Sequence, residues 1–321
     1  MSGSVRVAVV GTGSWGRQHA RVFSTRRESR LVAIVGRTPE KTARRAAEFG
    51  VPAYLDLDAM LAAERPDLVA VCLPNTEHFA PTLHLLEAGV PLFVEKPLAF
   101  DLAECDRLLD AAASRDLFFA INFNHRYAKP VQLARAAIAD GRVGELDFAT
   151  WRFGGEGRSD HHPHANLIET QCHGFDMLEW LVGPIASVQA VTGRVGTVVA
   201  SLRFASGAVG GLVGSYSASY AHGGTHRLEV SGTSGRVLVD DTVRRFTFQA
   251  AGSETAEVWE PGYFNDAERG FERTFDRHAA AMLRAFAAGE PPPVHARAGR
   301  RALELAEACI RSAETGERVA T

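Results

Sequence analysis

Two side chains suited to proton exchange and charge stabilisation stand far apart in the chain, Lys96 and His173. Lys96 lies in the tripeptide Glu95-Lys96-Pro97, directly after an apolar segment. An ammonium group there can stabilise a developing alkoxide or polarise a ketone, which assists hydride transfer. Pro97 favours extended backbone at Lys96 and so restricts where the ammonium points. We predict a catalytic Lys96; the alternative is a solvated surface lysine paired with Glu95.

His173 lies in a helical pattern, with Glu169 four residues before it and Asp176 three residues after it. These spacings would place all three on one helix face. A histidine beside carboxylates can exchange a hydroxyl proton near neutral pH, and a carboxylate can orient its ring. We predict that His173 is the general acid/base and that Glu169 assists it. The alternative is a histidine that only packs.

The segment from Gly11 to Gly16 has the spacing GxGxxG, with Gly13 as its middle glycine. It follows a predicted strand and opens a predicted helix, where such glycines allow a tight turn, close approach of a pyrophosphate and close helix packing. The helix N-terminus adds N–H groups for the phosphates. We predict a dinucleotide site that includes Ser14 and Trp15; the alternative is a glycine-rich turn without a ligand.

At the end of the second predicted strand, Gly36 stands where an acidic residue would bind the ribose hydroxyls of NAD. Arg37 follows it and can pair with a 2′-phosphate. Thr38 is a predicted N-cap, and Lys41 adds positive charge. NADP is therefore favoured over NAD. The alternative is that Arg37 stacks on the adenine and both cofactors bind.

Further candidates follow other predicted strands or precede the helix of His173. Within the cofactor site we also expect Pro74, Asn75, His78, Glu95 and Lys96. The substrate site is predicted to contain polar and aromatic side chains that suit hydroxyl groups: Lys96, Asn122, Arg126, Tyr127, His161, His162, His164, Asn166, Glu169 and His173. The spacing of the histidines matches no closed zinc site, so no metal is expected.

The elements that must position these residues alternate in the first part of the chain. The predicted strands are 5–10, 31–35, 68–73, 91–94 and 117–122, and the predicted helices are 16–23, 39–49, 78–87 and 102–113. Apolar strands without period-two alternation, joined by helices, predict a parallel doubly wound sheet.

The pattern changes after about residue 126. Helices are predicted at 130–139, 166–181, 267–288 and 298–313, and strands with glycine-marked turns at 197–204, 208–215, 228–231 and 237–239. The short connections imply antiparallel pairing. We predict an α/β Rossmann domain at 1–122 and an α+β domain at 123–321 with a predominantly antiparallel, open-faced sheet. The C-terminal helix is free to pack back on the first domain.

Composition limits the function classes. The chain has 321 residues, which favours two domains, and its net charge of −3 argues against nucleic acid as a partner. The four cysteines form no CxxC pair, which is typical of reduced thiols, and neither a secretory signal nor a membrane helix is evident. We expect a soluble, cytoplasmic protein.

Four of these segments together resemble the Gfo/Idh/MocA oxidoreductase family, the group of glucose-fructose oxidoreductase and inositol dehydrogenase. They are the glycine loop, residues 73–78, the tripeptide 95–97 and residues 169–176; residues 122–127, 141–145 and 231–235 also resemble family segments. The resemblance implies an N-terminal Rossmann domain, a C-terminal open-faced sheet, a homodimer or homotetramer, and NAD(P)-dependent chemistry on sugars or polyols. It also implies that Lys96 is the active-site lysine. The chain departs from the family pattern at Glu169 and Gln171, where Asp and Gly are usual.

The leading hypothesis is a reversible dehydrogenase that acts on a secondary alcohol or ketone carbon of a small polyhydroxylated substrate, either a sugar, a glycoside or a cyclitol. One alternative is a sensor or co-repressor that binds dinucleotide without turnover. Another is an oxidoreductase that recycles a tightly held cofactor. Retention of both Lys96 and His173 favours an enzyme.

Overall fold

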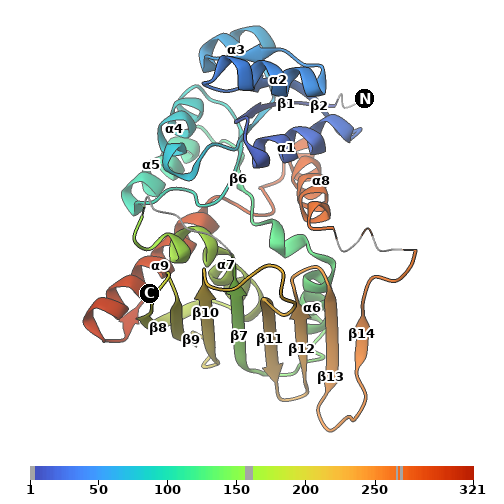
Figure 1. Cartoon of the computed structure of the whole chain (residues 1–321), viewed down its shortest axis with the longest axis vertical. Helices are drawn as coiled ribbons and strands as arrows, with labels where there is room; N and C mark the ends of the chain where they lie inside the picture. The colour runs from blue at the N-terminus through green and yellow to red at the C-terminus, as the bar shows by residue number, and fades with distance from the viewer. Residues whose placement is uncertain (1–3, 156–161, 265–266, 268–269) are drawn as a thin grey trace. The chain divides into compact units, whose positions relative to one another are not determined.

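The computed structural model describes residues 4–155, 162–264, 267 and 270–321. The chain divides into two compact units. Unit 1 comprises Met1–Phe123 and Phe275–Arg300, and unit 2 comprises Asn124–Thr274 and Arg301–Thr321 (Figure 1). Each unit is described by itself.

Unit 1 contains a six-stranded parallel sheet with the order β3-β2-β1-β4-β5-β6. The strands are β1 (Val5–Val10), β2 (Ser29–Val35), β3 (Ala53–Tyr54), β4 (Leu68–Val71), β5 (Leu92–Val94) and β6 (Phe119–Ile121). Every residue of β4, β5 and β6 is buried, as expected for strands covered on both faces. The helices of this unit are α1 (Ser14–Thr25), α2 (Pro39–Phe49), α3 (Leu57–Glu64), α4 (Phe79–Glu87), α5 (Leu102–Ala113) and α8 (Glu272–Ala288), the last belonging to it from Phe275 onward. This strand order defines a Rossmann-type domain, and the predicted fold class is confirmed.

Helix α8 comes late in the chain but groups with unit 1 because its side chains pack there. Asp276 accepts a hydrogen bond from Arg21 of α1 at 2.7 Å, and the Phe275 ring stacks on Trp15. The helix was predicted to begin at residue 267, whereas in the structure it begins at Glu272. Two short elements of this unit, β3 and α3, were not predicted from the sequence. Asp56 caps the N-terminus of α3 by accepting a hydrogen bond from the Ala59 N–H.

Unit 2 is built on a nine-stranded sheet with the order β14-β13-β12-β11-β7-β10-β9-β8-β15. The strands are β7 (Leu146–Gly154), β8 (Ile185–Thr192), β9 (Val198–Phe204), β10 (Val209–Ser215), β11 (His226–Gly232), β12 (Gly235–Asp240), β13 (Arg245–Ala250), β14 (Glu257–Trp259) and β15 (Val319–Ala320). Among the described residues, only the β7–β10 pair of this sheet is parallel and the other strand pairs are antiparallel, which confirms the predicted character of the sheet.

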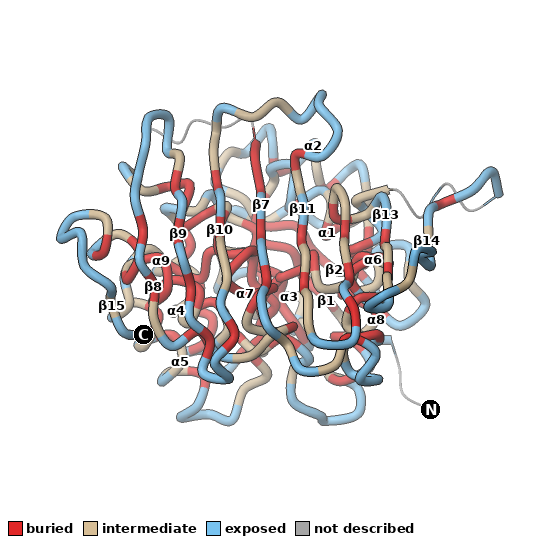
Figure 2. Tube along the Cα trace, turned by 90° about the horizontal axis from the view of Figure 1, so that it is seen from below, coloured by how far each residue is buried: buried red, intermediate tan, exposed pale blue. Residues whose placement is uncertain are grey.

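One face of this sheet is covered by α6 (Lys129–Ala139), α7 (Cys172–Val182) and α9 (Arg297–Thr315, in this unit from Arg301) (Figure 1). Along β9, buried and exposed residues alternate without exception, so one face of the strand lies in the core and the other is open (Figure 2). β7 lies at the centre of the sheet and was not predicted, although Ala149, Trp151 and Phe153 alternate as its buried residues. The helix predicted at 166–181 is interrupted: a π-helical turn, Asn166–Thr170, precedes α7.

Candidate functional site

The glycine loop follows β1 in unit 1, and two of its glycines are required by packing. Gly11 has φ +129°, and a Cβ there would lie 2.2 Å from the carbonyl oxygen of Cys72. A Cβ at Gly16 would lie 2.1 Å from the carbonyl oxygen of Gly11. A Cβ at Gly13, by contrast, meets no atom of the described residues within 4 Å beyond its local backbone. Packing therefore does not explain Gly13, whereas close approach of a ligand to the backbone does.

The N-terminus of α1 provides the electrostatic part of this site. Gly13 is its N-cap residue; within the described residues no side chain caps this end, and the first turn contains no acidic residue. Its N–H groups and partial positive charge suit the phosphates of a dinucleotide. Ser14 and Trp15 are both exposed here, and the Trp15 ring stacks on Phe275 with centroids 5.4 Å apart.

The end of β2 leaves little room for a side chain at residue 36. A Cβ at Gly36 would lie 2.6 Å from Thr12 Cγ2 and 2.6 Å from Thr42 Oγ1. Arg37 is largely exposed and forms an ion pair with Glu77 at 2.8 Å. Thr38 is the N-cap residue of α2, without a side-chain capping bond in the described structure, and Lys41 is exposed. The loop thus presents cationic groups, with one carboxylate, Glu77, beside Arg37.

A buried polar network surrounds Glu95, the residue before Lys96. Glu95 is buried and its Oε1 accepts hydrogen bonds from the Nδ2 of Asn122 and from the Nε2 of His19, both at 2.7 Å. Asn122 Oδ1 in turn lies 2.9 Å from His278 Nδ1. The backbone N–H of Lys96 donates to Glu95 Oε2 at 3.3 Å, and the Lys96–Pro97 peptide bond is cis.

The charge of Glu95 is retained in spite of its burial. Burial raises the pKa of this carboxyl, but the hydrogen bond and charge of His19, the charge of Lys96 and the Asn122 amide outweigh it, and the net pKa is lowered. Lys96 therefore follows a buried carboxylate whose position is fixed by hydrogen bonds. Asn122, predicted to bind substrate, is 1% exposed and directs its amide to Glu95 and His278, so the structure places it in this support instead.

His78 connects two loops at the same edge of the sheet. Its ring is buried, with one nitrogen next to the carbonyl oxygen of Leu73 and the other 3.2 Å from that of Pro97. Burial lowers the pKa of His78, partly offset by these carbonyl contacts. His78 thus links the segment after β4 to the segment of Lys96. Nearby, Pro74 is exposed and Asn75 begins a short 3-10 helix (Asn75–Glu77).

In unit 2, His173 lies in the first turn of α7 and stacks on His125. The two ring centroids are 3.9 Å apart and the rings are within 8° of parallel. Both residues are buried. His125 comes from a 3-10 helix, Asn124–Tyr127, and was not predicted as a site residue. It follows that His173 has an aromatic partner which sequence spacing does not indicate.

The helix predicted to carry Glu169, His173 and Asp176 begins in the structure with a π-helical turn. That turn contains Glu169, and α7 carries the other two residues. Both carboxylate oxygens of Asp176 accept from the Arg126 guanidinium, at 2.8 and 2.5 Å. Arg126, predicted to bind substrate, therefore anchors the His125 segment to α7, and neighbouring Tyr127 is half-buried.

The departure from the family pattern at Gln171 has a structural explanation. Its Oε1 accepts from Trp151 Nε1 at 3.2 Å, and its Nε2 donates to the Phe153 carbonyl and to Asn166 Oδ1. A Cβ at Gly214 would lie 2.4 Å from the Gln171 side chain, so a glycine on β10 accommodates it. Asn166 also donates to the Gly196 carbonyl, which places this predicted substrate ligand inside the supporting structure.

The remaining candidates include the histidine loop. His161 lies outside the described residues; the backbone N–H of His164 donates to His162 Nδ1 at 3.1 Å, and their rings are 6.0 Å apart. Across the described ranges no three histidine, cysteine or acidic residues are grouped as metal ligands would be. Tyr216, which was not predicted, pairs with Thr170 through their hydroxyl groups at 2.9 Å, and burial raises the pKa of this tyrosine to about 12.

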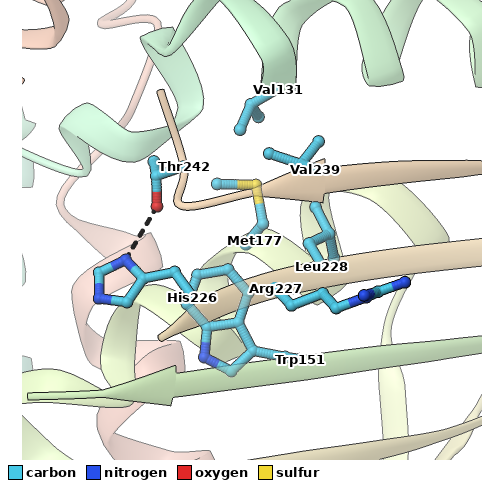
Figure 3. A pocket seen from close by; sticks show the side chains of 8 residues that line it. All are labelled: Val131, Trp151, Met177, His226, Arg227, Leu228, Val239 and Thr242. Carbon is cyan, nitrogen blue, oxygen red and sulfur yellow. Dashed lines mark hydrogen bonds between the residues drawn. The ribbon is translucent and has the colours of Figure 1, made fainter. Parts of the chain in front are cut away.

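His226, the first residue of β11, lines a small cavity of about 10 Å³, which has room for roughly one water molecule (Figure 3). Its Nδ1 lies 3.1 Å from Thr242 Oγ1 and its Nε2 lies 3.2 Å from the Gly154 carbonyl. The carbonyl requires an N–H at Nε2, so Nδ1 accepts from the threonine in the neutral ring. Burial lowers the pKa of His226 to about 4, partly offset by Gly154 and Asp241.

This shift predicts a pH dependence of stability. Because the folded-state pKa lies below the ordinary value of 6.5, the contribution of neutral His226 is complete above pH 6.5 and is lost as the pH falls towards 4. It amounts to at most about 3 kcal/mol. Melting temperatures measured in half-unit pH steps should show wild type losing stability relative to His226→Gln as the pH falls from 6.5 towards 4. A difference that stays constant with pH would contradict this assignment.

The glycine loop on a doubly wound sheet, with the lysine segment at the carboxyl ends of its strands, defines an NAD-binding oxidoreductase. Residues 5–123 match the model of an oxidoreductase family described as an NAD-binding Rossmann fold, and residues 135–321 match its C-terminal alpha/beta domain. The chain belongs to the Gfo/Idh/MocA oxidoreductase family.

Named relatives include dehydrogenases of cyclitols and sugars. The chain is 26% identical to a myo-inositol 2-dehydrogenase of Thermotoga maritima, over 97% of this chain and 96% of the relative. It is 34% identical to a D-glucoside 3-dehydrogenase of Escherichia coli over 47% of this chain and 44% of the relative. A solved levoglucosan dehydrogenase, in complex with NADH and L-sorbose, shares the fold with a TM-score of 0.89 at 20% identity, covering 99% of each chain.

Within the described residues, no helix is both long enough and apolar enough to cross a membrane.

Proposed function

We propose that this protein is an NAD(P)-dependent dehydrogenase that oxidises a secondary alcohol of a sugar, glycoside or cyclitol, or reduces the corresponding ketone. A dinucleotide at the glycine loop supplies the hydride acceptor or donor. His173 takes the hydroxyl proton as the carbon loses its hydride, and returns it in the reverse direction. Lys96 stabilises the negative charge that develops on the same oxygen.

The observation that carries this proposal is the hydrogen-bonded network around Glu95, next to Lys96. A solvated surface lysine needs no such neighbour, yet here an ionised, buried Glu95 is held by His19 and Asn122. Maintaining a buried charge requires several compensating partners. Such an arrangement suits a lysine whose ammonium must be present and positioned during a reaction, and it argues against the alternative of a non-catalytic sensor.

Two sequence relatives, together with the chemistry of the site, support the proposed substrate class. Their names specify inositol and a glucoside, both neutral and polyhydroxylated. Unit 2 provides hydroxyl groups of matching character, among them those of Tyr216 and of Thr170, three residues before His173. A neutral polyol is the substrate we propose, and a homodimer or homotetramer is the proposed assembly.

A spectrophotometric screen at 340 nm tests the proposed activity. NAD and NADP are each offered with myo-inositol, alkyl glucosides, levoglucosan and free aldoses. We expect cofactor reduction with at least one neutral polyol. Tight dinucleotide binding without turnover on any member of the panel would favour the sensor instead.

For the cofactor we propose a preference for NADP. The position of Gly36, where an acidic residue would bind the ribose of NAD, is crowded by the side chains of Thr12 and Thr42. Arg37 stands next to it, and its guanidinium is already oriented by Glu77. A 2′-phosphate would take the place of that carboxylate as a bidentate partner.

Paired variants of this ion pair test the preference. Arg37→Ala should weaken NADP binding about tenfold or more and leave NAD binding nearly unchanged, since it removes a charged partner of the phosphate alone. Glu77→Gln should strengthen NADP binding, because it removes the anion that competes with the phosphate. Dissociation constants from fluorescence titration check both. Equal effects on the two cofactors would overturn the assignment.

A further inference from the structure

The rings of His125 and His173 form a close stacked contact between two titratable groups. Their centroids are 3.9 Å apart and their planes lie within 8° of parallel. His125 is 3% exposed and His173 is 7% exposed. Two rings that can each accept a proton are thus placed in contact away from solvent.

The segment that carries His125 is fixed on both sides of the ring. Before it, Asn124 donates to Thr274 Oγ1 at 2.7 Å. After it, Arg126 holds Asp176 of α7, the helix that carries His173. Phe271 and Phe153 meet the His125 ring at steep angles, with centroids 5.4 and 5.7 Å away. The plane of His125 is therefore fixed relative to α7, and the ring of His173 lies against a rigid surface.

We propose that His125 is a positioning residue for His173: it fixes the plane of the catalytic imidazole and restricts the stacked pair to one proton. Two unit charges at this separation repel strongly even with the dielectric screening typical of proteins. The pair therefore titrates in two well-separated steps that belong to both rings. This inference rests on the proposed role of His173 as the acid/base.

The groups around the His125–His173 pair add no net positive charge to it, so the main obstacle to a second proton on the pair is the first proton. On β11, His226 lies 6.3 Å from His125 and stays neutral at physiological pH, so it adds no positive charge. On α7, Asp176 is paired with Arg126. A first proton on the stacked pair therefore meets no added positive charge from His226, whereas a second proton is opposed by the first.

The test uses two substitutions with different consequences. His125→Phe keeps a flat ring against His173 but cannot take a proton, whereas His125→Ala removes both the ring and the proton. His84→Ala, at a surface histidine that pairs with Asp58 in unit 1, is the matched control. Melting temperatures establish that each variant is folded, and His125→Gln replaces any variant that is not.

The first readout needs no cofactor. Ring signals of His173, assigned by their loss in His173→Gln, are followed by NMR from pH 4 to 9 in the protein without dinucleotide. In wild type and His84→Ala we expect two steps separated by about two pH units or more. His125→Phe should show one step. A single step with the same midpoint in wild type and His125→Phe would overturn the inference.

The second readout is the pH profile of turnover. We expect His125→Ala to lower kcat about tenfold with little change in KM, because the ring of His173 loses its fixed plane. His125→Phe should recover most of kcat at the optimum but change the acid limb of the profile. Wild-type profiles in both variants would reject the positioning role. If His173→Ala kept full activity while wild type still showed the two-step titration, the proposed function would fail and the coupling of the rings would stand.

Discussion

Replacing His173 or Lys96 by alanine should lower kcat by about 10²–10⁴-fold, the range typical of a lost general acid/base or a lost oxyanion partner. The His173 variant loses the group that exchanges the hydroxyl proton. The Lys96 variant loses the charge that stabilises the oxygen while hydride moves. Steady-state kinetics with the best substrate of the panel measure both effects.

Dinucleotide binding separates a chemical defect from a structural one. The shape of the glycine loop is set by the close backbone contacts of Gly11 and Gly16. Dissociation constants for the cofactor should change less than kcat, and melting temperatures establish that both variants remain folded. Activity within about threefold of wild type in either variant would contradict its catalytic role.

The second large effect is expected from the glycine loop, where Gly16→Ala and Gly13→Ala should fail in different ways. A Cβ at residue 16 would lie 2.1 Å from the Gly11 carbonyl oxygen, and backbone atoms cannot give way cheaply. Overpacking of this kind costs about 3 kcal/mol. We expect Gly16→Ala to lower the melting temperature clearly and to abolish dinucleotide binding.

Gly13→Ala is the matched variant, since its Cβ would meet open space. Its backbone, at φ −73° and ψ −169°, is also accessible to alanine. The melting temperature should therefore stay near wild type, while dinucleotide affinity falls at least about tenfold because the methyl group obstructs the pyrophosphate. Unchanged affinity in a folded Gly13→Ala protein would show that the phosphates do not approach the loop here.

Much of the architecture could be predicted because the signals are local. The bounds of α2 and α5 match the predicted 39–49 and 102–113, where Thr38 and Asp101 stand before the first turns. Strands β9 and β10 were predicted within one residue from their apolar runs and the glycine turn between them. β7 was missed because its parallel partner, β10, is distant in sequence, and so no short turn marks the pairing.

Individual site residues were harder to predict, because their partners come from other elements. The sequence identified Lys96 and His173 as chemically capable groups, but not His19, which reaches Glu95 from α1. His125 was likewise missed, since only the fold brings it against His173. Asn122 and Asn166 were predicted as substrate ligands from their polarity, whereas the structure uses both amides for support.

The most direct test of the central claim, that Lys96 and His173 act on the same substrate carbon, is a double-mutant cycle in kcat. Groups that serve one reacting centre act as a unit, so their removal is strongly non-additive. The Lys96→Ala/His173→Ala protein should be about as slow as the slower single variant. A double variant slower by the full product of the two single effects would show that the two groups work independently and would contradict the account.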